Sequence, residues 1–209
     1  MELKVLVPSR MEEITLEQYQ RFLKECKDET LSEETIALKM LEIFCGVPPA
    51  QAYTYKMTDV YNICDKINKA LNEKPPLISR WKYEDLELGF IPKLDDMTFG
   101  EFVDVDTYIT DWDQMHKAMA VLYRPVKQQF KGSYEIEEYK SDTYWELMKQ
   151  MPLSLVMGCM LFFWNLENDL VQVMKTSSNP KAKLIFQEKL TSTLSTAGII
   201  PSGVCQEKT

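Results

Sequence analysis

The sequence predicts a mainly α-helical fold, a compact helical domain around one central apolar helix at about residues 152–174. The run from Leu153 to Trp164 contains only one clearly polar residue, Ser154. A helix that crosses a bilayer needs about 20 apolar residues in succession, so this shorter run indicates a helix buried in a protein core. Capping patterns precede several other amphipathic stretches, and the apolar content of 45% is enough to bury a sizeable core.

The N-terminal residues 1–75 are expected to form a compact helical unit with a short strand in front of it. The strand is predicted where the sequence LKVLV, residues 3–7, precedes a proline. Three helices are predicted after it, over residues 16–27, 32–45 and 58–72. Thr15 and Gln18 have the spacing of a capping box, Ser32 is a typical N-cap, and Gly46 is a typical helix stop.

Residues 77–94 change in character and predict a small β-hairpin near 77–91. Two short apolar and aromatic runs, ISRWKY and LELGFI, are separated by Glu84 and Asp85. Such runs on either side of a short polar pair are typical of two antiparallel strands joined by a tight turn.

Residues 98–175 are expected to supply the core helices of the same domain, which then spans residues 1–175. Thr98 and Glu101 form a second capping box, at the start of a helix. The apolar positions of that helix are Phe99, Phe102, Val103, Val105 and Tyr108. Three further features are expected before the apolar helix: a helix over 112–123 that stops at Arg124-Pro125, a polar loop with a turn at Lys131-Gly132, and a short helix capped by Asp142.

Residues 176–209 are expected to form a linker, a segment that could be one more amphipathic helix over 181–195, and a tail. The apolar positions of that segment are Leu184, Ile185, Leu190 and Leu194. From Gln172 to the end of the sequence there are five lysines and two glutamates, a net charge of +3.

The negative charge of the chain is concentrated in one segment. Between Glu84 and Asp113 there are ten acidic residues and one base, Lys93, so this segment has a net charge of −9. The whole chain has a net charge of −8, so the rest of it sums to +1. A surface of this sign repels phosphate, which disfavours a nucleic-acid partner but does not exclude a basic protein partner. The residues expected to bind that partner are Asp95, Asp96, Glu101, Asp104, Asp106, Asp111 and Asp113.

The sequence predicts no catalytic residue, no cofactor and no metal site. The single histidine, His116, cannot build a two-histidine zinc site and is expected to be a packed or surface residue. Phosphate-binding glycine loops and the GxSxG motif are missing, and the five cysteines are expected to be reduced thiols. An alternative is an enzyme that binds a divalent metal through the acidic cluster of residues 104–113, although the EF-hand pattern does not fit there. The N-terminal sequence lacks the apolar core of a signal peptide, and no membrane segment is expected.

Five blocks of the sequence, taken in their order and spacing, resemble an uncharacterised family of tailed-bacteriophage proteins. The blocks are EITLEQYQRFLK (Glu13 to Lys24), GFIPKLDDMTFGEFVDVDTY (Gly89 to Tyr108), HKAMAVLYRPV (His116 to Val126), YEIEEY (Tyr134 to Tyr139) and MPLSLVMGCMLFFWNL (Met151 to Leu166). They cover about Glu13 to Val173, and the family brings no assigned catalytic residue.

The resemblance implies a virion structural or assembly protein that docks on other phage structural proteins, and that could form a homo-oligomer. A head–tail or tail-associated component found in the virion is one such protein. A tail assembly chaperone that acts in the host cytoplasm and is absent from the mature virion is an alternative. A further alternative is a small early-infection protein that binds a host factor.

Overall fold

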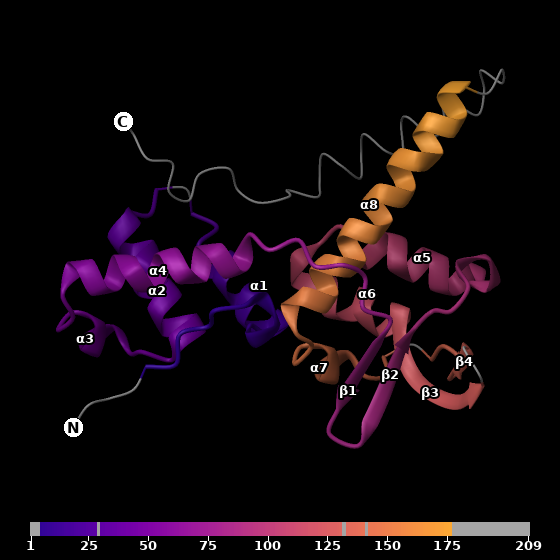
Figure 1. Cartoon of the computed structure of the whole chain (residues 1–209), viewed down its shortest axis with the longest axis horizontal. Coiled ribbons are helices and arrows are strands. Elements are labelled where there is room, and N and C mark those ends of the chain that lie inside the picture. The colour runs from indigo at the N-terminus through magenta and orange to yellow at the C-terminus, as the bar shows by residue number, and fades with distance from the viewer. Residues whose placement is uncertain (1–4, 29, 131–132, 141, 177–209) are drawn as a thin grey trace.

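The computed structural model describes residues 5–28, 30–130, 133–140 and 142–176. In these residues the chain is mainly α-helical, with one small antiparallel sheet of four strands (Figure 1). The N-terminal helices α1–α4 lie at one end of an elongated molecule, and the sheet with α5, α6 and α7 lies at the other. The last helix, α8, rises out of the body and projects away from it.

The N-terminal unit contains a 3-10 helix and four α-helices. They are η1 Met11–Glu13, α1 Leu16–Glu25, α2 Glu33–Cys45, α3 Pro49–Ala52 and α4 Met57–Leu71. The predicted caps are confirmed: Thr15 accepts a hydrogen bond from the Gln18 amide, Ser32 accepts one from Thr35, and Gly46 ends α2 with a φ of 65°. These caps involve residues a few positions apart, which is why the local sequence predicts them.

The predicted N-terminal strand is wrong over the residues that the structure describes. Val5 to Val7 have no regular secondary structure, although Val5 and Val7 pack partly against the core and Leu6 is exposed. In the described part of the chain, no strand pairs with this segment. Without a partner the backbone cannot form the ladder of hydrogen bonds that defines a strand.

The sheet has the strand order β1-β2-β3-β4, with every neighbouring pair antiparallel. The strands are β1 Arg80–Tyr83, β2 Leu86–Phe90, β3 Tyr123–Phe130 and β4 Ser133–Ile136. The predicted hairpin is confirmed as β1 and β2, with Trp81 opposite Leu88. The second pair of strands replaces the polar loop expected after Arg124-Pro125, whereas the turn expected at Lys131-Gly132 lies outside the described residues.

Helices α5 (Phe99–Tyr108) and α6 lie between β2 and β3 in the chain, and α7 lies between β4 and α8. The 3-10 helix η3 Trp112–Gln114 leads into α6 Met115–Leu122, whose residues are buried except for the half-buried Lys117. α7 Trp145–Met148 begins after Tyr144, which has a positive φ of 67°. The prediction that Asp142 is the N-cap of this helix is therefore wrong, because Tyr144, two residues later, occupies the N-cap position.

The apolar helix predicted over 152–174 is α8, Leu153–Thr176. Its first turns are buried, with Leu153, Val156 and Cys159 inaccessible to solvent. Farther along, Trp164 is 42% exposed. The described part of the chain thus covers the base of α8 more fully than its middle. None of the described helices combines the length and the apolar character needed to cross a membrane.

A short bridge joins the N-terminal helices to the base of α8. Thr15 and Pro152 form an isolated antiparallel bridge, in which the Leu16 amide donates to the Met151 carbonyl and the Leu153 amide donates to the Ile14 carbonyl. Backbone bonds therefore tie the start of α1 directly to the start of α8.

Candidate docking surface

The helix α5, Phe99–Tyr108, begins at a capping box that sets its position. Thr98 accepts a hydrogen bond from the Glu101 amide at 3.3 Å, and the Glu101 carboxylate accepts one from the Thr98 amide at 2.6 Å. The 3-10 helix η2, Leu94–Asp96, comes directly before the cap. The paired bonds satisfy two backbone N–H groups that would otherwise lack partners at the helix start.

The inward side of α5 is held by a buried ion pair. Glu101 is only 3% exposed and lies 2.7 Å from the Arg124 guanidinium, itself 8% exposed, on β3. Burial lowers the pKa of Arg124, and the nearby Glu101 carboxylate acts in the opposite direction. Val105 is buried on the same side, and Asp104 accepts a hydrogen bond from the Tyr139 hydroxyl at 2.5 Å.

The outward side of α5 carries its large apolar residues. Phe99 is 82% exposed, Phe102 is 49% exposed and Val103 is 41% exposed. With the exposed Asp106, these residues have the spacing i, i+3, i+4, i+7, which places them on one side of a helix. We call these four residues the α5 face.

The orientation of α5 corrects the sequence prediction, in which the apolar positions of this helix belonged to the core. A helix at a protein surface usually buries its apolar stripe. Here the ion pair between Glu101 and Arg124, together with Val105, occupies the inward side instead. The α5 face is consequently left toward solvent.

The seven acidic residues expected to bind a partner do not all lie at the surface. Asp95, Asp96, Asp106 and Asp113 are exposed, Asp104 and Asp111 are partly buried, and Glu101 is buried. Glu101 therefore has to be removed from the predicted set, because its carboxylate is bound to Arg124 and to the Thr98 amide. The sequence contained a signal for this, since the capping-box spacing already pairs the Glu101 side chain with the Thr98 amide.

Two of the acidic residues, Asp111 and Asp96, have polar partners nearby. Asp111 caps η3, where it accepts hydrogen bonds from the Asp113 amide at 2.9 Å and from the Gln114 side chain at 3.0 Å. Asp96 lies 3.8 Å from Lys93, and both side chains are largely exposed. Exposed pairs of this kind contribute little to stability, so Asp96 keeps most of its charge available to a partner.

The acidic residues do not converge into a metal site in the described part of the chain. There, no three His, Cys, Asp or Glu side chains are arranged to hold an ion. The alternative of a metal-dependent enzyme that uses residues 104–113 therefore gains no support from their placement.

His116 is packed in the interior, as one of the two expected placements. The Gln20 side chain lies 3.2 Å from its Nδ1 atom and donates to the Trp112 carbonyl at 2.6 Å. Because the Gln20 amide nitrogen is a donor, Nδ1 acts as the acceptor and the neutral ring carries its proton on Nε2. Burial lowers the pKa of His116, which favours this neutral form.

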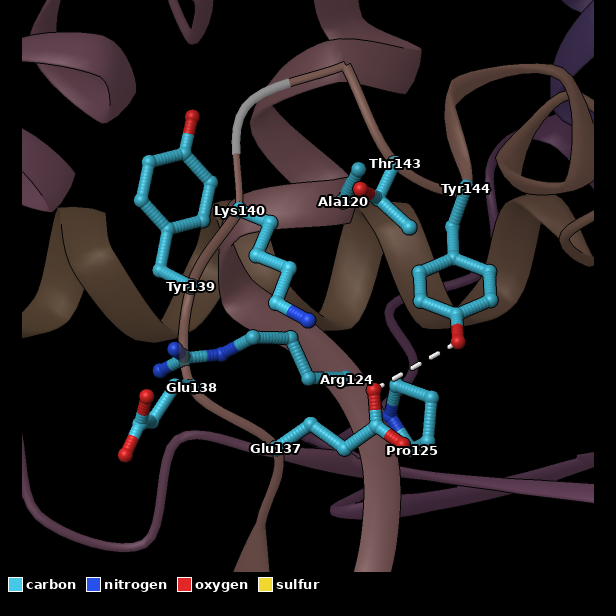
Figure 2. Close-up of a pocket in the computed structure, with 9 residues that line it drawn as sticks. All are labelled: Ala120, Arg124, Pro125, Glu137, Glu138, Tyr139, Lys140, Thr143 and Tyr144. Carbon is cyan, nitrogen blue, oxygen red and sulfur yellow. Dashed lines mark hydrogen bonds between the residues drawn. The ribbon is translucent and has the colours of Figure 1, made fainter.

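A small pocket lies beside Arg124, the cationic member of the buried ion pair (Figure 2). Arg124 and Tyr139 line it, and the Tyr144 hydroxyl points toward Glu137 across a long hydrogen bond of 3.5 Å. Its volume is about 10 Å³, which is room for about one water molecule. A pocket for an organic substrate is usually about 300–1,000 Å³, so this one does not suit a metabolite.

Comparisons with known proteins found no matching family model, no matching curated protein and no matching solved structure. The resemblance to tailed-phage proteins consequently remains a prediction from the sequence.

Proposed function

We propose that this protein acts by docking on another protein through the α5 face, as a non-enzymatic structural or assembly component of a tailed phage. The observation that carries the proposal is the exposure of Phe99, Phe102 and Val103 on one side of a capped helix. Single exposed apolar residues are common, but a stripe with helical spacing is typical of a surface that another protein covers. Aromatic residues are also enriched in such interfaces.

The charges around the α5 face favour a basic partner. Asp106 lies within the face, and Asp95 and Asp96 are exposed directly before the start of the helix. Opposite charge across an interface speeds the encounter and fixes its orientation, whereas the buried apolar contact supplies most of the affinity. Phe99, the most exposed of the large residues on α5, is the natural anchor.

We further propose that the domain, and the assembly it joins, are organised around α8. The burial of the first turns of α8 supports a domain organised around this helix. Trp164 and Leu166 are exposed farther along α8, and a neighbouring subunit could cover them. In this proposal the protein is a head–tail or tail-associated component. The alternative of a tail assembly chaperone uses the same surfaces, but it releases its partner before the particle is complete.

The docking proposal is tested by Phe99→Gln in the phage that encodes the chain. Tyr53→Gln is the matched control, because Tyr53 is also a highly exposed aromatic residue but lies after α3, in the N-terminal unit. We expect Phe99→Gln to lower the yield of infectious particles at least about tenfold with unchanged thermal stability, since a hot-spot residue contributes about 2 kcal/mol or more. An unchanged yield from a folded Phe99→Gln protein would overturn the docking role of the α5 face.

Mass spectrometry of purified particles separates the two versions of the proposal. The protein should be present at a stoichiometric level if it is a virion component. Presence in infected cells with absence from particles would assign it to the chaperone alternative.

A further inference from the structure

The chain itself contains a segment whose chemistry is complementary to the α5 face. Residues 181–195 carry three lysines and one glutamate, and their apolar residues predict an amphipathic helix. The segment between Glu84 and Asp113, which contains α5, is the acidic part of the same chain. Residues 181–195 lie outside the described part of the structure, so only their sequence enters the argument.

We propose that residues 181–195 bind the α5 face of the same molecule and that an assembly partner has to displace them. The inference rests on the proposed docking function of that face and adds its regulation. Apolar residues of the segment cover Phe99 and Val103, and its lysines lie near Asp95, Asp96 and Asp106. The face is then shielded in the free protein and becomes available only when a better ligand competes.

The length of the chain permits this contact. α8 is described as far as Thr176, and the four residues 177–180 separate Thr176 from the segment. Four extended residues that run back along α8 place Lys181 about 14 Å below its last described turn, and a helix of 15 residues is about as long as the remaining 22 Å of the roughly 36 Å of α8. The whole segment, with its lysines, can therefore lie beside the lower part of α8.

Because the segment belongs to the same chain as the α5 face, a weak contact is enough to keep the face mostly occupied. A short tether gives an effective concentration on the order of 1 mM, so a contact with a dissociation constant of about 0.1 mM would be about 90% occupied. Exposed charge pairs contribute little by themselves. The occupancy thus depends on the apolar contact, and the charges select the orientation.

The test uses the full-length Val103→Cys variant and measures how fast a thiol reagent modifies the side chain at position 103. Mass spectrometry of the digested protein gives the extent of modification for each peptide. Val103 is partly exposed and outside the core, so its replacement leaves the fold intact. The second variant adds Lys181→Glu, Lys183→Glu and Lys189→Glu. The control is Tyr53→Cys in both backgrounds, because Tyr53 directly follows α3, and α3 lies at the opposite end of the molecule from α5 (Figure 1).

We expect the lysine reversals to speed modification at position 103 at least about fivefold and to leave position 53 unchanged. Reversing Asp95, Asp96 and Asp106 to lysine in the lysine-reversed chain should restore the slow rate. The slow rate should not vary over a tenfold range of protein concentration, whereas a rate that falls with concentration would mean that another copy supplies the segment and would overturn the intramolecular contact.

Equal rates at position 103 with and without the lysine reversals would also overturn the inference. That result would leave the docking function standing if Phe99→Gln still lowers the particle yield. Loss of the Phe99 effect is the result that would overturn the docking function itself.

Discussion

Gly158 lies where α8 touches the chain that leads into the hairpin, and its replacement by alanine is the sharpest test of that packing. A Cβ atom at position 158 would lie 2.3 Å from the Pro76 carbonyl oxygen and 3.0 Å from its carbon. Both atoms belong to the backbone, so no side chain can rotate away. Either α8 or the Pro76 segment would have to move by about 1 Å to reach the ordinary contact distance of about 3.5 Å between non-bonded atoms.

The expected magnitude follows from two opposing effects. Overpacking of a well-packed core costs about 1–3 kcal/mol. Alanine is favoured over glycine inside a helix by about 0.5–1 kcal/mol, which offsets part of that cost. We therefore expect Gly158→Ala to lower the free energy of unfolding by about 1–2 kcal/mol.

Gly100→Ala is the matched control, because Gly100 is also a helical glycine but has nothing within 4 Å of its added Cβ. It should leave stability unchanged or raise it by up to about 0.5–1 kcal/mol. The measurement is urea denaturation of the parent chain and of both variants, in which the transition midpoints and slopes are compared. A Gly158→Ala protein as stable as the Gly100→Ala protein would refute the close approach of α8 to Pro76.

Three further predictions concern the buried ion pair, the histidine and α8. Arg124→Met should cost about 3–5 kcal/mol because it leaves the Glu101 charge buried without its partner, and adding Glu101→Gln should recover part of that loss in the same denaturation assay. His116 has a pKa below its usual 6.5, so the unfolded chain binds the proton more readily. The part of the free energy of unfolding that depends on neutral His116 should consequently be fully present above that pH and fall as the pH drops below it. His116→Gln should flatten this pH dependence in a series of denaturation curves. Leu153→Ala should cost about 2–5 kcal/mol, whereas Leu166→Ala, 36% exposed in the parent chain, should change the midpoint little; equal losses at both positions would contradict the burial gradient along α8.

Local features of the sequence predicted the helix starts and the first hairpin well. Thr15, Ser32 and Thr98 each act on a backbone amide within the next turn, so short windows contain the whole signal. The β1–β2 hairpin is likewise closed by neighbouring residues at Glu84 and Asp85.

The β3–β4 pair was not predicted because its strands are rich in polar residues and because β3 also pairs with a strand that is distant in sequence. β3 contains the polar residues Lys127, Gln128 and Gln129, which resemble a loop when read alone. The polar half of β3 pairs with β4, whereas the start of β3 pairs with β2, where Gly89 lies opposite Arg124 although the two are far apart in sequence. Pairing partners at such separations are not encoded in a local pattern.

The sequence by itself determined that residues 99–108 form a helix, where that helix starts, and that acidic and apolar residues alternate along it. Only the tertiary structure decided which side of the helix is buried. The buried Glu101 side chain forms an ion pair with Arg124 on β3. Two charges that are removed from water are stable only when they pair. That pairing sets the rotation of α5 about its axis, and Phe99, Phe102 and Val103 are left on the surface as a consequence.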